Sequence, residues 1–320
     1  MSKRKRGATG NKWKWVIISV VLVVLLVPFG LYAGLDRENK ELNETTRTQL
    51  GGTYVTLSDG VTHYELDGPG EGQTVVLVHG ATIPMWIWDS QVGALTSAGF
   101  RVLTYDMYGR GYSDRPDVDY NRELYRKQIL DLLDTLDVTE PVDLVGLSLG
   151  GAIVTDFTAN YPKRVRRLVL VAPVVNSVSN DTSMKLLRPP VIGEFLMRTV
   201  AVKTFVSRAS SLFEGTNMAD QYNEQFYDQV TYKGFERASI SMFRGDAIGD
   251  YREAYRSVGK QNRKVMLVWG TEDEDISREM IDEVQKAIPH IQFHCLEGVG
   301  HQLNLEVAEE LNQLMIDFLK

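Results

Sequence analysis

The stretch Leu144–Gly151 reads LVGLSLGG, and it determines the fold that we assign to this 320-residue chain. The apolar residues before Gly146 are typical of a buried strand, and a helical pattern follows over Ala152–Tyr161. A serine on a sharp turn from strand to helix has a strained backbone, and only small residues two positions before and after it avoid collisions. The G-x-S-x-G spacing therefore predicts an exposed Ser148 hydroxyl at a strand end, with the amino terminus of a helix behind it.

Short apolar runs alternate with helical patterns on both sides of this turn. The runs are residues 74–78, 101–105, 142–145, 168–171, 265–269 and 291–295. Unbroken runs that are rich in β-branched residues suit parallel strands buried on both faces. Amphipathic segments such as Leu124–Leu136 lie between them, so the alternation predicts a doubly wound, mostly parallel sheet. Ahead of these runs, Ser58-Asp59-Gly60 joins two alternating segments, Thr53–Leu57 and Val61–Leu66, which predicts a β-hairpin.

One long segment interrupts the alternation. Between Pro173 and Gln261 the sequence contains no apolar run typical of a buried parallel strand, and it reads as helical pieces separated by proline and glycine. Such a segment is too long for a simple loop. We therefore expect an α/β core over residues 53–173 and 263–320, with a helical cap inserted over residues 174–262.

The N-terminal region has a different composition. Residues 1–14 contain six basic and no acidic residues, and residues 16–35 are almost wholly apolar. About 20 helical residues span a bilayer core of roughly 30 Å. We therefore predict an uncleaved signal anchor over 16–35, with a basic tail over 1–15 before it and a tether over 36–52 after it. The positive-inside rule places the tail in the cytoplasm and the body outside it. The alternative is a cleaved signal peptide and a secreted body, although Leu31 fits the cleavage pattern poorly.

The charge and cysteine content limit the classes of partner. The whole chain has a net charge of −7, so residues 15–320 carry −13 once the basic tail is set aside. Phosphate binding needs clustered Lys and Arg, which argues against a nucleic-acid partner. Cys295 is the one cysteine, so an intrachain disulfide is excluded, and we expect a small buried residue there. The sequence suggests no metal-ligand cluster and no phosphate loop, so no cofactor is expected, and the oligomeric state stays open.

A serine hydroxyl is a weak nucleophile that needs a base and an orienting carboxylate. His301 follows the last apolar run in a glycine-rich loop, from which it can reach over the sheet edge to Ser148. We expect structural roles for the other four histidines: His63, His79, His290 and His294. Four acidic residues in a row, 272–275, follow the run at 265–269, and spacing alone does not choose among them.

An oxyanion that forms at Ser148 needs two hydrogen-bond donors. The N–H of Leu149, directly after the serine, is the first candidate. The loop after the first core strand contains Gly80, which allows the backbone to approach closely. The N–H of Ala81 is the predicted second donor, and that of Thr82 is the alternative.

Taken together, these segments resemble the α/β-hydrolase fold superfamily, in its serine esterase and lipase-like branch (monoacylglycerol lipase-like or carboxylesterase-like). The similar motifs are VHGA at 78–81, YDMYGRGYSDRP at 105–116, GLSLGG at 146–151, LVAP at 170–173, WGTED at 269–273 and GVGH at 298–301. The resemblance covers residues 53–320. It implies that the acid is Asp273, three residues after the glycine that ends its strand, and that Ala81 donates to the oxyanion. Dehalogenases and epoxide hydrolases of this superfamily carry an aspartate nucleophile, where this chain has Ser148.

The resemblance and the site residues together predict a serine hydrolase that cleaves carboxylic esters through an acyl-enzyme on Ser148. The apolar cap and the membrane segment favour a lipid or monoacylglycerol-like ester as substrate. The same residues are compatible with hydrolysis of C–C bonds, amides or lactones, or with peroxidation. A non-enzymatic, membrane-tethered binding protein is the third hypothesis, and the intact set of site residues argues against it.

Overall fold

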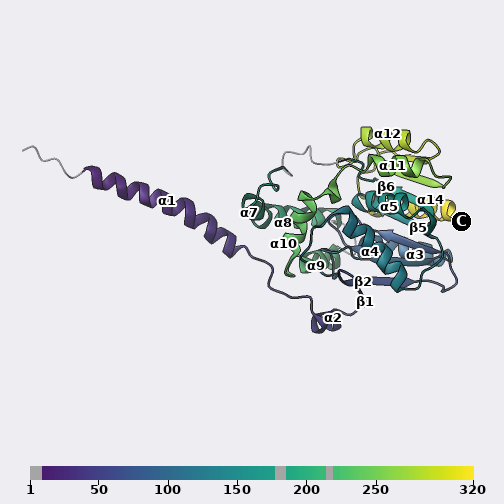
Figure 1. Ribbon diagram of the computed structural model, residues 1–320, viewed down its shortest axis with the longest axis horizontal. Helices are drawn as coiled ribbons and strands as arrows, with labels where there is room; N and C mark the ends of the chain where they lie inside the picture. Colours follow the sequence, from purple (N-terminus) through teal and green to yellow (C-terminus); the bar gives the residue numbers. More distant parts are fainter. Residues whose placement is uncertain (1–8, 177–184, 214–218) are drawn as a thin grey trace, which may run out of the picture.

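The computed structural model describes residues 9–176, 185–213 and 219–320, and an eight-stranded sheet forms the centre of the body (Figure 1). The strands are β1 (Thr53–Leu57), β2 (Gly60–Asp67), β3 (Thr74–Val78), β4 (Arg101–Tyr105), β5 (Val142–Leu147), β6 (Val165–Val171), β7 (Val265–Gly270) and β8 (Gln292–Leu296). Their order across the sheet is β1-β2-β4-β3-β5-β6-β7-β8. β2 pairs antiparallel with β1 and with β4, and the other neighbouring pairs are parallel. The predicted hairpin and the predicted mostly parallel sheet are confirmed.

Two groups of helices flank the sheet. The first group contains α4 (Arg122–Thr135), α5 (Leu149–Asn160), α11 (Arg252–Gly259) and α12 (Arg278–Ala287), and the second contains α3 (Asp89–Ser97), α13 (Leu303–Glu306) and α14 (Ala308–Leu319). Short 3-10 turns, η1 (Met85–Trp88) and η2 (Pro162–Arg164), complete the core. α4 begins where the Asn121 side chain accepts the N–H of Leu124, and its apolar side is buried as predicted.

The inserted cap consists of short helices. They are α7 (Ile192–Leu196), the π-helical η4 (Met197–Ala201), α8 (Val202–Phe213), α9 (Ala219–Gln229), α10 (Phe235–Arg244) and η5 (Asp246–Ile248). The predicted cap boundary of 174–262 is too wide, because α11 packs on α5 and α12 of the core. The buried residues Ala254, Tyr255 and Val258 lie on one helical face, and the Tyr255 hydroxyl donates to Val174 O at 2.8 Å. The amphipathic pattern of residues 252–259 indicates a helix, but it does not indicate whether that helix packs on the cap or on the core.

α1 (Thr9–Gly34) projects away from the body (Figure 1). Within the described ranges, its segment Trp13–Gly34 is the one helix that is long and apolar enough to cross a membrane. The segment after it, predicted as a tether over residues 36–52, is partly helical and contacts the body. It contains α2 (Glu44–Leu50), and Lys40 exchanges backbone hydrogen bonds with Thr231 and Lys233 of the body.

The expectation that Cys295 is buried is wrong, because the side chain is exposed. Cys295 lies on β8, which is at the edge of the sheet and has β7 as its one neighbour among the described strands. The apolar run of this strand resembled that of a central strand, but the residues of β8 are only partly covered. Hydropathy alone does not distinguish an edge strand from an inner one.

Candidate active site

Ser148 lies on the turn between β5 and α5, at the carboxyl end of a central strand. Its backbone has φ 55° and ψ −118°, in a region that a non-glycine residue adopts only under strain. Two hydrogen bonds hold this turn against the end of β6 and the chain after it. Ser148 N donates to Val171 O at 2.9 Å, and Ser148 O accepts from Val174 N at 3.0 Å. The strained serine predicted from the motif is therefore present.

The two glycines of the motif are required by close backbone approach. A Cβ atom at Gly146 would overlap the backbone of Gly150. A Cβ atom at Gly150 would overlap the carbonyl oxygens of Val78 and His79. Because these neighbours are backbone atoms, no side-chain movement could relieve the overlap. The small residues on both sides of the serine thus follow from packing of α5 against β3 and β5.

His301 and Asp273 come together from two different loops. His301 follows β8 and Asp273 follows β7, and His301 Nδ1 lies 2.8 Å from Asp273 Oδ2. The other carboxylate oxygen, Asp273 Oδ1, accepts the N–H groups of Asp275 at 2.9 Å and Ile276 at 2.8 Å. The Asp273 side chain is fully buried. With Nδ1–H donated to this fixed carboxylate, Nε2 is left as the proton-accepting nitrogen of the ring.

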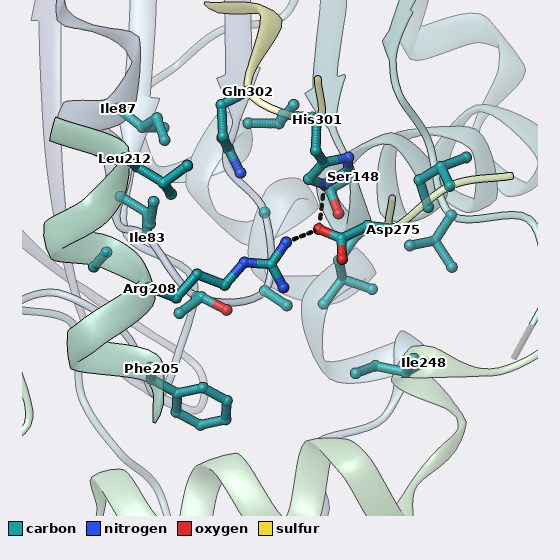
Figure 2. A pocket seen from close by; sticks show the side chains of 18 of the residues that line it. Ile83, Ile87, Ser148, Phe205, Arg208, Leu212, Ile248, Asp275, His301 and Gln302 are labelled. Atoms are coloured by element: carbon teal, nitrogen blue, oxygen red, sulfur yellow. Dashed lines mark hydrogen bonds and ion pairs between the residues drawn. The ribbon is translucent and has the colours of Figure 1, made fainter. Parts of the chain in front are cut away.

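Ser148 and His301 both point into a pocket between the strand ends and the cap (Figure 2). Gly80, Ala81 and Leu149 line the same pocket. A Cβ atom at Gly80 would lie 3.3 Å from Ser148 Cβ, so the loop at 79–82, which contains the predicted oxyanion donor, lies directly against the serine. Among the described residues, no acceptor takes the N–H of Ala81 or Leu149. Both predicted donors are thus available to a bound oxyanion.

Two of the other histidines have the structural roles that the sequence predicted. His79 is fully buried, its Nδ1 lies 2.7 Å from Gly80 O, and its Nε2 accepts the N–H of Met107 at 2.9 Å. Burial lowers the pKa of His79 to about 4, so the neutral ring holds the Gly80 loop in place. His63 Nδ1 lies 2.8 Å from the buried carboxylate of Asp106. The remaining two are outside the pocket lining: His290 lies just before β8 and His294 lies within it.

Sequence reasoning missed three charged residues in the pocket. Asp275 Oδ2 lies 3.7 Å from His301 Nε2, and Asp275 also forms an ion pair with Arg208 of α8 (Figure 2). Arg188, just before α7, lines the pocket as well. The acidic run at 272–275 was the one sequence feature that pointed to Asp275, and it did not indicate that Asp275 pairs with an arginine of the cap. The histidine therefore has a carboxylate near each ring nitrogen.

The fold and the site define a hydrolase of the α/β type. Residues 75–314 match the Alpha/beta hydrolase family, and the chain belongs to that family. The chain is 26% identical over 282 residues to a 2-hydroxy-6-oxo-6-phenylhexa-2,4-dienoate hydrolase of Comamonas testosteroni, covering 82% of this chain and 93% of that protein. It is 29% identical over 277 residues to a 2-hydroxy-6-oxo-2,4-heptadienoate hydrolase of Pseudomonas putida, covering 83% and 95%.

Solved structures support the same fold. The crystal structure of the enol-lactonase from Burkholderia xenovorans LB400 matches with a TM-score of 0.69 and 23% identity, covering 83% of this chain and 99% of that one. The α/β-hydrolase fold predicted from the sequence is confirmed. The relatives support a hydrolase, and their names describe reactions other than simple ester cleavage.

Proposed function

We propose that the protein cleaves carboxylic esters through an acyl-enzyme formed on Ser148. The observation that carries this proposal is the 2.8 Å contact between His301 Nδ1 and Asp273 Oδ2, beside a pocket that Ser148 shares. An imidazole oriented in this way is suited to accept the proton of a serine hydroxyl.

The proposed reaction has two halves. In the first, His301 Nε2 takes the Ser148 proton, Oγ attacks the ester carbonyl, and the N–H groups of Ala81 and Leu149 stabilise the oxyanion. His301 then returns the proton to the leaving alcohol as the C–O bond breaks. In the second half, His301 deprotonates a water molecule that attacks the acyl carbon, and Ser148 leaves with the proton. Asp273 stays ionised and orients the ring throughout.

The cap favours an apolar acyl group. The cap side of the pocket contributes apolar side chains from α8, α10 and η5: Phe205, Leu212, Phe243 and Ile248. Apolar walls with a few polar groups at the reacting centre are typical of small-molecule sites. We therefore propose a lipid or monoacylglycerol-like ester as the substrate.

We also propose that α1 anchors the protein in a membrane, with the N-terminus in the cytoplasm and the body outside it. The exposed apolar segment Trp13–Gly34 and the basic residues before it support this arrangement. The alternative is cleavage within this segment, which would release the body.

One observation favours a second candidate reaction, the hydrolysis of a C–C bond in an anionic substrate. Arg188 and Arg208 both line the pocket, and guanidinium groups bind carboxylates well. The Comamonas and Pseudomonas relatives are named for dienoates, which carry a carboxylate. In this reaction the same three residues would act on a carbonyl carbon whose leaving group is a carbon atom.

The test is a comparison of two substrates in wild type and Ser148→Ala. Wild type should hydrolyse p-nitrophenyl butyrate, and Ser148→Ala should lose that activity, while the exposed Ser97→Ala control keeps it. Full activity in Ser148→Ala would contradict the proposed nucleophile. Faster cleavage of a 2-hydroxy-6-oxo-dienoate than of any ester in an acyl-length series would select the second reaction instead.

A further inference from the structure

The cap has an exposed apolar edge, formed by Val191, Ile192 and Val200. Val191 is 80% exposed, and Ile192 and Val200 are each 54% exposed. Ile192 and Val200 lie about two turns apart on the continuous helical stretch of α7 and η4. Single exposed apolar residues are ordinary on protein surfaces, whereas three within ten residues of one helical stretch and its N-cap point to an interaction site.

The backbone of Val191 adds a second observation. Val191 has φ 69° and ψ −51°, a conformation with positive φ that a β-branched residue rarely adopts. The fold thus holds an apolar side chain outward at a strained position, where most of the side chain gains no burial. Backbone strain of this kind is concentrated at functional positions.

The apolar edge adjoins the end of α1. The Arg198 guanidinium of η4 lies 4.0 Å from the centre of the Tyr32 ring on α1, and it donates to Asp36 Oδ2 at 3.0 Å. In return, Arg37 Nη1 donates to Arg198 O at 3.0 Å. Val200 is two residues from Arg198, so it lies close to this junction. Figure 1 shows α7 beside the end of α1, on the side of the body from which α1 projects.

The charge around the apolar edge is opposite to that of the body. Residues 15–320 carry a net charge of −13, whereas residues 185–208 contain five basic residues and one acidic residue. Two of the five, Arg198 and Arg208, are paired with acidic residues of other segments, and the other three supply the positive charge beside the edge. Lys185, Arg188 and Lys203 are exposed there. Exposed apolar side chains flanked by Lys and Arg are the composition of elements that lie in the boundary of an anionic bilayer.

We infer that the apolar edge of the cap inserts into the lipid–water boundary of an anionic bilayer, beside the point where α1 leaves it. The inference rests on the proposed placement of α1 in a membrane. Tyr32 would lie at the interfacial level preferred by aromatic residues, and Arg198 fixes η4 at that level. α8 continues from this edge to Phe205 and Leu212 in the pocket, so the same helical stretch joins the bilayer to the active site.

The first experiment measures the depth of single labels on the full chain in phosphatidylglycerol-containing vesicles. Three single-cysteine variants are made in a Cys295→Ser background and labelled with an environment-sensitive fluorophore: Leu22→Cys in α1, Val200→Cys in the apolar edge, and Thr139→Cys before β5. We expect lipid-borne quenchers to quench the labels at 22 and 200 but not at 139.

Two outcomes would overturn the inference, and they can be told apart. A quenched label at 22 with unquenched labels at 200 and 139 would keep the anchor but remove the edge from the bilayer. An unquenched label at 22 would remove the anchor as well. The quenching results do not depend on catalysis. Hydrolysis of a short soluble ester is measured separately in each sample, so a failure of the proposed esterase activity is seen independently of the position of the labels.

The second experiment links the edge to substrate supply. Val200→Glu places a charge in the apolar edge, and Thr139→Glu is the matched control. We expect Val200→Glu to lower turnover of a vesicle-embedded ester by about fivefold or more, since membrane insertion scales with buried apolar area. Turnover of a soluble short-chain ester should stay within about twofold of wild type. Equal effects on both substrates, or no effect on either, would contradict the inference.

Discussion

Asp273→Asn is expected to disable the proposed base, His301, while leaving the surroundings of the carboxylate almost unchanged. Asp273 Oδ1 accepts the N–H groups of Asp275 and Ile276. In the asparagine variant the amide oxygen must take this place, because an NH₂ group cannot accept these bonds. The NH₂ group is then turned toward His301 Nδ1 and donates to it. The two backbone donors therefore determine the orientation of the new amide.

This orientation reverses the tautomer of the histidine. With Nδ1 accepting, the neutral His301 ring carries its hydrogen on Nε2, which cannot take the Ser148 proton. In a serine protease the same substitution lowers kcat by about 10⁴-fold with the geometry intact. We expect a loss of about 10³- to 10⁴-fold here, which corresponds to about 4–5 kcal/mol of transition-state stabilisation.

The assay is kcat for p-nitrophenyl butyrate with the detergent-solubilised full chain. Asp275→Asn is the matched control, because Asp275 is the other carboxylate near the ring and lies on the Nε2 side. We expect Asp275→Asn to retain activity within about tenfold of wild type. Circular dichroism checks that both variants are folded. If Asp273→Asn keeps more than a tenth of the wild-type kcat, or if Asp275→Asn is the more damaging change, the proposed assignment of the acid is refuted.

Three further changes test separate parts of the structure. Arg208→Gln removes the ion pair that joins α8 of the cap to Asp275 beside His301, so kcat/KM should fall a few-fold while the Tm changes little; wild-type kcat/KM would contradict a role for this pair in the pocket. Gly150→Ala places a Cβ atom against Val78 O, which should displace the turn that presents Ser148. A fluorophosphonate probe should then label Ser148 weakly or not at all, and labelling at the wild-type level would contradict the close contact at this turn. The pKa of His79 is lowered by burial to about 4 from 6.5, so the unfolded chain binds more protons between these values and stability present above pH 6.5 is lost as the pH falls toward 4. This amounts to at most about 2 kcal/mol by pH 5, and a Tm series should show a smaller loss in His79→Gln than in wild type.

The core of the fold could be predicted because its strands are buried on both faces. β3 and β4 begin and end at the predicted residues, because the apolar and β-branched side chains that identify these runs in the sequence are the ones that the sheet buries. The turn at Ser148 was predictable for a similar reason, because only glycines fit the backbone contacts around it. His301 and Asp273 were predicted to act together, and the structure places them in contact.

The features that the sequence did not reveal depend on contacts between distant segments. Arg208 and Asp275 meet across the pocket from the cap and from the loop after β7. Lys40 meets Thr231 and Lys233, which changes the expected tether into a docked segment. Local patterns carry no information about such partners. The exposure of Cys295 also could not be predicted, because it follows from the position of β8 at the edge of the sheet and not from the neighbouring residues in the sequence.

The central proposal is that Ser148 forms a covalent acyl intermediate. The most direct measurement is peptide mass spectrometry of the full chain, quenched in acid within the first turnover of an activated ester. We predict an acyl adduct on the peptide that contains Ser148, with no adduct in Ser148→Ala. An adduct on another residue, or turnover of the ester by folded protein with Ser148 unmodified, would contradict the account.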